Sequence, residues 1–239
     1  MTLTDDRPVL VDCRGLARVY GSGGAAVVAV SGVTCQVRPG DRIALVGSSG
    51  SGKSTLLHLM GGLETPSAGT ITWPALPMRD GRPRDVGVVF QGPSLLPALD
   101  VTENVALPLV LAGAGQQEAT DRATEAIAAV RLTEQARAVP EELSGGQSQR
   151  AALARVLAAA PTLVLADEPT GQLDHATARV VLDALLHVVD RIGAALVVST
   201  HDPFVAERLP VRWQMQDGVL LDGSRPDVLD QARATGGPR

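Results

Sequence analysis

The stretch LVGSSGSGKST, residues 45–55, joins an apolar strand, a glycine loop and the start of a helix, and it decides which fold we expect. Its pattern is G-x-x-x-x-G-K-[ST], with Gly47 and Gly52 in register after the apolar run at 43–46. Glycines allow successive backbone N–H groups to turn inward around an anion, and the helix that follows adds the positive end of its dipole. The pattern therefore predicts a phosphate-binding loop.

Lys53 is the only lysine among the 21 basic residues of the chain. A compact ammonium on a thin stem suits a phosphate cradle, whereas the wide planar guanidinium of arginine would crowd it. The hydroxyl of Ser54 is predicted to bind Mg²⁺. We expect the phosphates of a nucleotide to be held by the whole loop, which comprises Gly47, Ser48, Ser49, Gly50, Ser51, Gly52, Lys53, Ser54 and Thr55.

Composition limits the class of protein. The 239 residues can bury a large core, as one domain or as one domain with a lobe. A formal net charge of -5 argues against a nucleic-acid surface, so we expect no nucleic-acid partner. Cys13 and Cys35 fit no metal-ligand spacing, which favours two ordinary core thiols in a reduced cytosolic compartment.

Targeting and membrane signals are missing from the sequence. The N-terminal stretch MTLTDDRPVL lacks the basic and apolar regions of a secretory signal. No uncharged apolar run reaches membrane-spanning length. We therefore expect a soluble chain that acts at a membrane through a partner.

Strands and helices alternate along the chain. Apolar runs at 86–91, 162–167 and 195–200 read as buried strands, and helical spacing covers about 101–140 and 175–191. The alternation predicts an α/β fold with a mostly parallel sheet covered on both faces, into which a helical lobe is inserted. The tail after residue 223 is polar and is expected to be frayed.

Two further stretches carry polar groups at the ends of elements. LVLADE, residues 163–168, is an apolar strand that ends in two carboxylates. Asp167 at the strand tip lies beside the phosphate loop in this topology and can hold the hydration shell of Mg²⁺. Glu168 is our candidate general base for a water that attacks the γ-phosphate, the alternative being a solvated strand-end acid. In ELSGGQSQR, Ser144 precedes a helical run, which by itself indicates an N-cap.

Taken together, these motifs resemble the nucleotide-binding subunits of ABC transporters, from about residue 9 to residue 222. GSSGSGKST looks like their Walker A loop, LSGGQ like the family signature and LVLADEP like the Walker B strand. Gln91 in VVFQ matches the Q-loop, Asp174 in GQLD the D-loop and His201 in STHD the switch histidine. Tyr20 matches the aromatic residue that stacks on adenine.

The resemblance implies a P-loop NTPase core with a mostly parallel sheet, an N-terminal antiparallel β lobe and an inserted α-helical lobe. It places one ABC ATPase domain over residues 1–239. The expected divisions are a core with its antiparallel lobe at about 9–91 and 160–222, a helical lobe at about 92–159, and a polar tail at 223–239.

The resemblance also implies how the chain works. In such proteins the signature helix is far from its own phosphate loop, so two chains sandwich two ATP molecules and each signature caps the γ-phosphate held by the other chain. Asp174 would reach across the dimer, Gln91 would touch Mg²⁺ and the attacking water, and His201 would bind the γ-phosphate. The residues implied at the partner's ATP are Ser144, Gly145, Gly146 and Gln147.

Several motif sequences are similar to those of the branch of ABC ATPases that works with permeases of the lipoprotein-release and macrolide-export type. Thr170 follows the Walker B sequence DEP, where many importer ATPases carry phenylalanine. Such a branch implies ATPase activity, a second copy of the subunit as a homodimer partner, and an integral membrane permease. It also implies a cytoplasmic location, peripheral on the inner face of the cell membrane.

Two features depart from that branch. The connection at 74–85 is shorter than is usual there and resembles importers of the taurine and nitrate kind. Ser148 stands where a longer polar or charged residue is common, which predicts tuning of the dimer interface. Two alternatives therefore stay open: an importer ATPase subunit, and a soluble ABC ATPase of an assembly system that has no permease.

Overall fold

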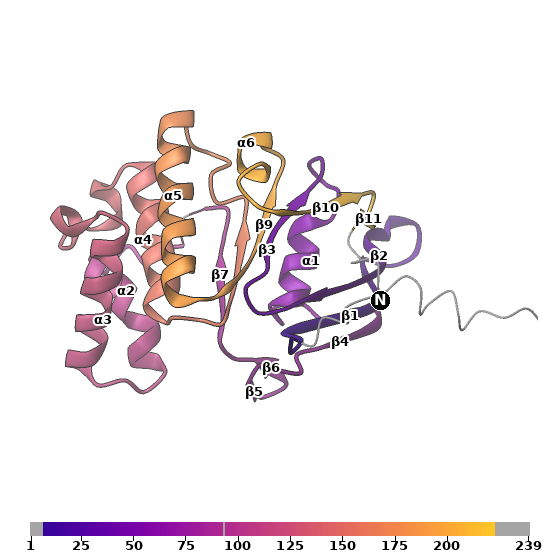
Figure 1. The fold of residues 1–239 in the computed structure, drawn as a ribbon, viewed down its shortest axis with the longest axis horizontal. Helices are drawn as coiled ribbons and strands as arrows, with labels where there is room; N and C mark the ends of the chain where they lie inside the picture. The colour runs from indigo at the N-terminus through magenta and orange to yellow at the C-terminus, as the bar shows by residue number, and fades with distance from the viewer. Residues whose placement is uncertain (1–6, 93, 223–239) are drawn as a thin grey trace, which may run out of the picture.

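The structure is a computed structural model that describes residues 7–92 and 94–222 (Figure 1). The strands are β1 (Val11–Tyr20), β2 (Val27–Val37), β3 (Arg42–Val46), β4 (Ala68–Thr72), β5 (Met78–Arg79), β6 (Arg82–Pro83), β7 (Val86–Val89), β8 (Leu163–Asp167), β9 (Ala195–Thr200), β10 (Val211–Gln216) and β11 (Val219–Asp222). The α-helices are α1 (Lys53–Met60), α2 (Val101–Leu111), α3 (Gln116–Ala129), α4 (Gly145–Ala158), α5 (His175–Ile192) and α6 (Pro203–Ala206). Short 3-10 turns are η1 (Gly23–Ala25), η2 (Thr133–Gln135) and η3 (Pro140–Glu142).

The central sheet has six strands in the order β11-β10-β3-β9-β8-β7. Neighbouring strands from β10 to β7 are parallel, and β11 pairs antiparallel with β10. Every residue of β8 and β9 is buried. Continuous apolar runs of this kind belong to parallel strands that are covered on both faces. The predicted mostly parallel sheet is therefore confirmed.

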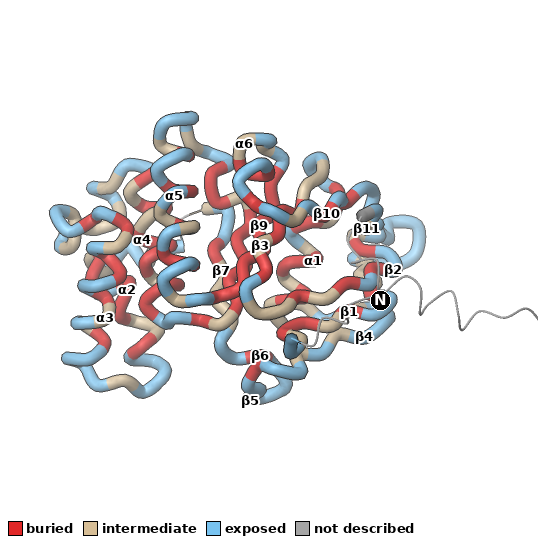
Figure 2. Tube along the Cα trace, viewed as in Figure 1, coloured by how far each residue is buried: buried red, intermediate tan, exposed pale blue. Residues whose placement is uncertain are grey.

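The two faces of this sheet belong to two separate apolar cores, as the red segments on either side of it indicate (Figure 2). Along β3, Ile43 and Leu45 pack with α1 and the N-terminal strands, whereas Ala44 packs with the helical side. This division follows from the strand itself, because successive side chains point to opposite faces of a sheet. The alternation fixes the sheet between its two covering layers.

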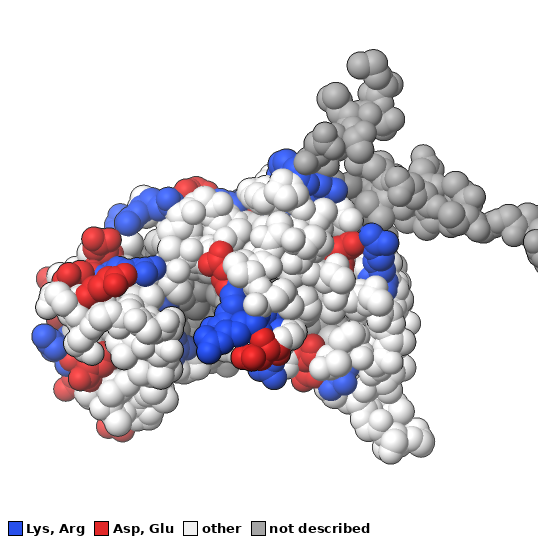
Figure 3. Space-filling view, turned by 90° about the horizontal axis from the view of Figure 1, so that it is seen from below, with Lys and Arg blue, Asp and Glu red and all other residues white. Residues whose placement is uncertain are grey.

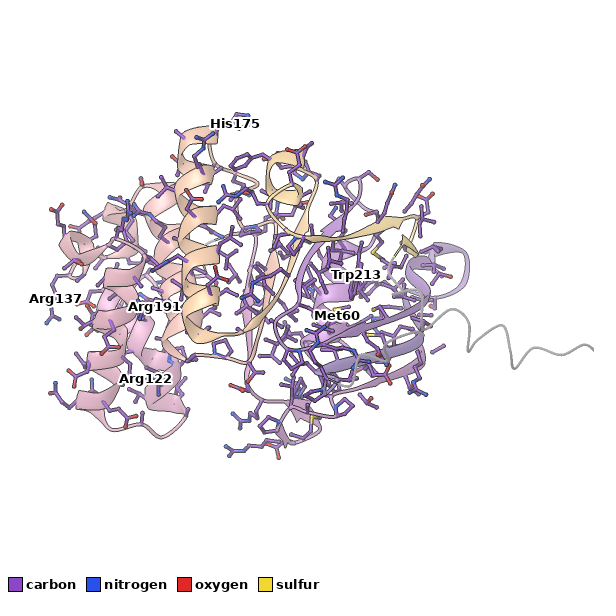
Figure 4. All side chains as sticks on the ribbon, in the orientation of Figure 1. Met60, Arg122, Arg137, His175, Arg191 and Trp213 are labelled. Carbon is purple, nitrogen blue, oxygen red and sulfur yellow. The ribbon has the colours of Figure 1, made fainter. Side chains whose placement is uncertain are left out.

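The N-terminal strands form the predicted antiparallel lobe, a three-stranded sheet in the order β2-β1-β4. Cys13 and Cys35 face each other across β1 and β2, and both thiols are buried. A hydrogen bond with Cys35, together with burial, raises the pKa of Cys13 above its ordinary value. Met60 and Trp213 lie in the core between this lobe and the central sheet (Figure 4).

The helical lobe consists of α2, α3 and α4, which lie on the β7 side of the molecule (Figure 1). Helix α2 begins at Asp100, whose carboxylate accepts the N–H of Glu103 in a capping box. Arg122 and Arg137 project from the outer surface of the lobe (Figure 4). Because α4 contacts both α5 and β7, it connects the lobe to the core.

Several short elements lie where the sequence gave no clear signal. The connection at 74–85 holds a hairpin of the two-residue strands β5 and β6. Strands β10 and β11 and helix α6 complete the part of the chain after β9. The two-residue strands β5 and β6 leave too few residues for a period to be read. The polar tail expected at 223–239 lies outside the described residues.

Among the described residues, no helix has the length and apolar character needed to cross a membrane. On the face drawn in Figure 3, acidic and basic side chains lie side by side and are separated by wide uncharged areas. This face therefore has mixed charge.

Candidate functional site

The loop between β3 and α1 passes so close to other backbone that two of its glycines have no room for a side chain. A Cβ added to Gly47 would lie 2.3 Å from the carbonyl oxygen of Met215. At Gly52 it would lie 2.0 Å from the carbonyl oxygen of Ala29, and the φ of Gly52 is +98°, in the left-handed region. Strands β10 and β2 thus demand glycine at both ends of the loop.

Lys53 begins α1 and its side chain is almost fully buried. Its Nζ donates to the carbonyl oxygens of Gly47 and Ser48, at 2.9 Å each. The same nitrogen lies 3.6 Å from Oε1 of Glu168. A buried ammonium is stable only with such partners, and these hold it at the mouth of the loop, next to a carboxylate that the end of β8 supplies.

Asp167 joins the tip of β8 to the loop. Its Oδ1 accepts the hydroxyl of Ser54 at 2.9 Å, and it also accepts the hydroxyl of Ser199 from the end of β9. A hydroxyl and a carboxylate are oxygen ligands of the kind that Mg²⁺ prefers. Within residues 7–92 and 94–222, no group of three or more His, Cys, Asp or Glu side chains could hold a metal ion. Mg²⁺ needs no such group, because it keeps several waters and binds through one or two carboxylates and substrate phosphates.

Glu168 turns sharply out of the strand. Its φ is +43°, a left-handed value that costs a non-glycine residue about 1–3 kcal/mol. Its N–H donates to both oxygens of Ser199, at 3.1 Å to the carbonyl and 3.0 Å to the hydroxyl. Its Oε2 lies 2.6 Å from Nδ1 of His201. The turn therefore points the carboxylate between the lysine and the histidine.

These groups border one cavity of about 530 Å³. It is lined by Val27, Val28, Ala29, Ser48, Ser49, Gly50, Ser51, Gly52, Lys53, Ser54, Thr55, Gln91, Glu168 and His201. The hydroxyl oxygen of Ser51 is buried and has no hydrogen-bond partner among the described residues. Loop amides, an ammonium and an unsatisfied hydroxyl together fit a polyphosphate, so the residues present suit a nucleotide.

Gln91 follows β7 and is exposed at this cavity. Two side chains of α4 hold the chain on either side of it. Gln149, which is buried, donates from Nε2 to the carbonyl oxygen of Phe90 at 3.2 Å, and Arg155 donates to the carbonyl oxygen of Ser94 at 2.5 Å. Helix α4 therefore holds the chain on both sides of Gln91.

Four of the predicted residues lie outside the cavity, at the N-terminus of α4. Ser144 is the N-cap there and forms a capping box with Gln147, in which Ser144 Oγ accepts the N–H of Gln147 at 3.3 Å. Gly145 and Gly146 form the first turn, and a Cβ on Gly146 would lie 2.2 Å from Cγ2 of Thr177. None of these four residues lines the cavity at α1.

Asp174 and Tyr20 also lie outside the cavity lining. Asp174 is the N-cap of α5, where the hydroxyl and amide of Thr177 lower the pKa of its carboxyl group. Tyr20 ends β1 and pairs with Val27, which does line the cavity. Arg18 covers one face of the Tyr20 ring.

Sequence reasoning missed the residues that position others. Ser199 binds both Asp167 and the backbone of Glu168, and the signal it offered was a hydroxyl at the end of the apolar run 195–200. Gln149 and Arg155 gave no signal, because their partners at Phe90 and Ser94 are far away in the sequence.

A family model described as "ABC transporter" matches residues 30–171 of this chain, which is more than half of it. The chain is 40% identical over 220 residues to the "Lipoprotein-releasing system ATP-binding protein LolD" of Legionella pneumophila (strain Paris), covering 89% of this chain and 97% of the relative. It is 41% identical over 222 residues to the protein of the same name from Chromohalobacter salexigens, covering 90% and 94%.

Solved structures give the same result. The structure titled "Dimeric Structure of MJ0796, a Bacterial ABC Transporter Cassette" matches with a TM-score of 0.79 at 33% identity, over 88% of this chain and 96% of that one. A post-hydrolysis state of the MJ0796 ATP-binding cassette, bound to ADP and Pi, matches with a TM-score of 0.78 at 31% identity, over 90% and 98%. In sequence and in fold, this chain belongs to the ABC transporter family.

Proposed function

We propose that this chain is the ATP-binding and ATP-hydrolysing subunit of an ABC transporter, and that two copies close around two ATP molecules to drive a membrane permease. One observation carries the proposal: the loop amides, the Lys53 ammonium, the Glu168 carboxylate and the His201 imidazole meet in a single cavity. The division of residues 1–239 into one ABC ATPase domain, with a core, an antiparallel lobe and a helical lobe, belongs to the same proposal.

The chemistry follows from what each side chain can do. Lys53 and the loop amides stabilise negative charge that develops on the β- and γ-phosphate oxygens. Mg²⁺, when bound, neutralises further charge on those oxygens, and Ser54, Asp167 and Gln91 would hold it. The hydrogen bond between Ser54 and Asp167 supports this assignment, because it already brings two oxygen ligands together.

Glu168 is the proposed general base. Its carboxylate orients a water molecule for attack and accepts a proton from it. Nδ1 of His201 lies 2.6 Å from the carboxylate, and the imidazole would also reach the γ-phosphate, so it would hold base and phosphate in register. The strained backbone of Glu168 supports a catalytic role, since strain of this kind is concentrated at functional sites.

The second half of each ATP site would come from the partner copy. The N-terminus of α4 offers amide groups and the Ser144 hydroxyl on a surface apart from the chain's own cavity. A helix N-terminus attracts anions. Ser144, Gly145, Gly146 and Gln147 are therefore proposed to cap the γ-phosphate bound to the other chain, with Asp174 contacting the partner beside them.

The partner of the dimer is proposed to be an integral membrane permease of the lipoprotein-release or macrolide-export type. The names of the two LolD relatives support this branch. The chain would then work in the cytoplasm, peripheral on the inner face of the cell membrane, and hydrolysis would loosen the closed dimer and move the permease.

The test is to purify tagged Glu168→Gln protein from its native cells in mild detergent with ATP, and to identify accompanying proteins by mass spectrometry. A Lys53→Ala sample is the matched control, because it should not close around ATP. We expect a polytopic protein with few membrane helices and a large outer domain in the Glu168→Gln sample alone.

Other outcomes would overturn the permease assignment in a defined way. Soluble partners alone would indicate an ABC ATPase of an assembly system. A permease with many membrane helices and a separate binding protein would indicate an importer subunit. Absence of ATP hydrolysis by the wild-type protein, alone or with its partner, would overturn the enzymatic part.

A further inference from the structure

Tyr20 is the only tyrosine of the chain, and one face of its ring is already occupied. The guanidinium carbon of Arg18 lies 4.6 Å from the ring centroid. A guanidinium at this distance is attracted by the electron-rich face of the ring. The stack therefore restrains the plane of the ring from one side.

Arg18 is itself held from a different part of the molecule. Its Nη2 lies 2.7 Å from Oε2 of Glu64, and the two side chains are 25% and 29% exposed. Its Nε is buried without a hydrogen-bond partner among the described residues, so the arginine gives up one donor to keep this position. Glu64 follows α1, and its N–H donates to the carbonyl oxygen of His58 in that helix, at 3.3 Å. Through Glu64, the arginine is fixed to the helix that begins in the phosphate loop.

The tyrosine lies beside the wall of the cavity. Tyr20 pairs with Val27 across β1 and β2, and Val27, Val28 and Ala29 form the apolar side of the cavity. Tyr20 as a residue is 37% exposed. A flat apolar group that extends from phosphates in the loop towards β2 would meet this ring.

We propose that Arg18 is a positioning residue for base recognition: anchored by Glu64, it stacks on one face of Tyr20 and fixes the plane on which a purine base of the bound nucleotide stacks. The proposal rests on the proposed function, because it assigns the base end of the same nucleotide site. It adds an arginine that contacts the ring and a glutamate that holds the arginine, neither of which is proposed to contact the nucleotide.

The experiment measures binding of two probes, Mg-ATP and inorganic tripolyphosphate, by calorimetry in the Glu168→Gln background, which prevents turnover. Arg18→Ala is expected to weaken ATP binding about threefold to tenfold, the range that corresponds to loss of a partly exposed cation–π contact and looser stacking. Tripolyphosphate has no base, so its affinity should stay unchanged. Arg14→Ala is the matched control, because it removes the same charge from the same strand at a site where Arg14 pairs with Asp12 instead.

A double-mutant cycle separates positioning from general electrostatics. If Arg18 acts through the ring, adding Arg18→Ala to Tyr20→Ala should change ATP affinity little further. Equal weakening of both probes, or the same loss with and without Tyr20, would overturn the proposal. If wild-type protein binds neither probe, the proposed function itself fails, which is a separate and recognisable result.

A second readout keeps the test decisive if Arg18→Ala folds poorly. Tyrosine-labelled protein gives ring signals from one residue in a nuclear magnetic resonance spectrum, since Tyr20 has no counterpart in the chain. In the Glu64→Gln variant, which keeps the side-chain shape, these signals should shift and the effect of ATP on them should shrink. Unchanged signals and an unchanged response to ATP would overturn the role of the anchor.

Discussion

The N-termini of helices α1 and α4 differ in how they are capped and in which side chains surround them. Helix α1 begins after Gly52, which has no capping side chain, so its first amides open into the cavity that holds Lys53 and Glu168. Ser144 is the N-cap of α4: its hydroxyl accepts the N–H of Gln147, and the side chain of Gln147 accepts the N–H of Ser144, which leaves the amides of Gly145 and Gly146 outside this capping box. No residue of that second terminus lines the cavity at α1.

The difference shows which half of a site one chain can supply. At α1 all these groups come from one chain: the Glu168 carboxylate lies against Lys53 and His201, and the Ser54 hydroxyl is bonded to Asp167. At α4 there is an anion-attracting helix end beside α5, without these reactive groups around it. We call the N-terminus of α1, with these reactive side chains, the equipped terminus, and that of α4 (Ser144–Gln147), which lacks them, the bare terminus. A chain with one of each supports the proposal that two copies complete each other's sites.

Removing the base from the equipped terminus should have the largest effect. Glu168→Gln is expected to slow ATP hydrolysis about 10²- to 10⁴-fold, as expected for loss of a general base. ATP binding should persist, and the variant should accumulate as a dimer with ATP in size-exclusion chromatography. A purely monomeric variant under these conditions would contradict the role given to the bare terminus.

Substitutions of Lys53 test whether ATP hydrolysis depends on the charge or on the shape of this side chain. Lys53→Ala should lower hydrolysis about 10²- to 10³-fold, because it removes a charge that faces the phosphate in the transition state. Lys53→Arg should be almost as poor, since a planar guanidinium does not fit between the carbonyl oxygens of Gly47 and Ser48. Steady-state phosphate release measures both, and activity near wild type in Lys53→Arg would contradict the shape argument.

The proposed phosphate contact of the bare terminus can be disrupted without removing the cap of α4. Aspartate caps helices about as well as serine, so Ser144→Asp should leave the melting temperature nearly unchanged. Its negative charge would oppose the partner's γ-phosphate, and in the Glu168→Gln background the ATP-dependent dimer should weaken at least tenfold while each chain still binds ATP. Analytical ultracentrifugation gives the dimerisation constant. A dimer of undiminished affinity would show that Ser144 does not face nucleotide.

The packing around the bare terminus should make two adjacent glycines, Gly145 and Gly146, differ in how well they tolerate alanine. A Cβ on Gly146 would lie 2.2 Å from the methyl group of Thr177, which cannot turn away without losing its hydroxyl bond to Asp174. Overpacking of this kind costs about 1–3 kcal/mol, so Gly146→Ala should lower the midpoint of urea unfolding. Gly145→Ala is the control, because its Cβ would meet Leu173 at an ordinary 3.8 Å. Equal stability of the two variants would contradict this contact.

The smallest expected effect concerns the cap of α5. Because hydrogen bonds from Thr177 lower the pKa of Asp174, its charge stabilises the folded state at pH values above the ordinary carboxyl value of 3.8. That contribution is lost as the pH falls through the lower folded-state pKa. Asp174→Asn keeps a capping side chain, so the small stability difference from wild type should shrink between pH 6 and about pH 3. A difference that is independent of pH, in urea unfolding without ATP, would contradict the argument.

Local signals in the sequence predicted the mostly parallel sheet, whereas the antiparallel lobe was expected only from the resemblance to ABC ATPases. A buried parallel strand must be apolar along its length, as β8 and β9 are, and a helix start needs a cap that is readable within a few residues. The hairpin at 74–85, the edge strand β11 and its neighbour β10 escaped prediction, since these elements are determined by what they pair with. In the candidate site, the motif positions were readable, whereas the partners Ser199, Gln149 and Arg18 were not.

By itself, the sequence determined the chemistry available to this protein: a glycine loop with the one lysine, a strand that ends in Asp167 and Glu168, and a serine and glycines before a second helix. The tertiary structure alone decided how these groups face each other. It brought the ends of β8 and β9 against the loop, turned Glu168 into a left-handed conformation between Lys53 and His201, and kept the second helix terminus away from them. The physical reason is that side-chain chemistry is fixed residue by residue, whereas distances between strand ends arise only when the sheet has formed and its two cores are packed.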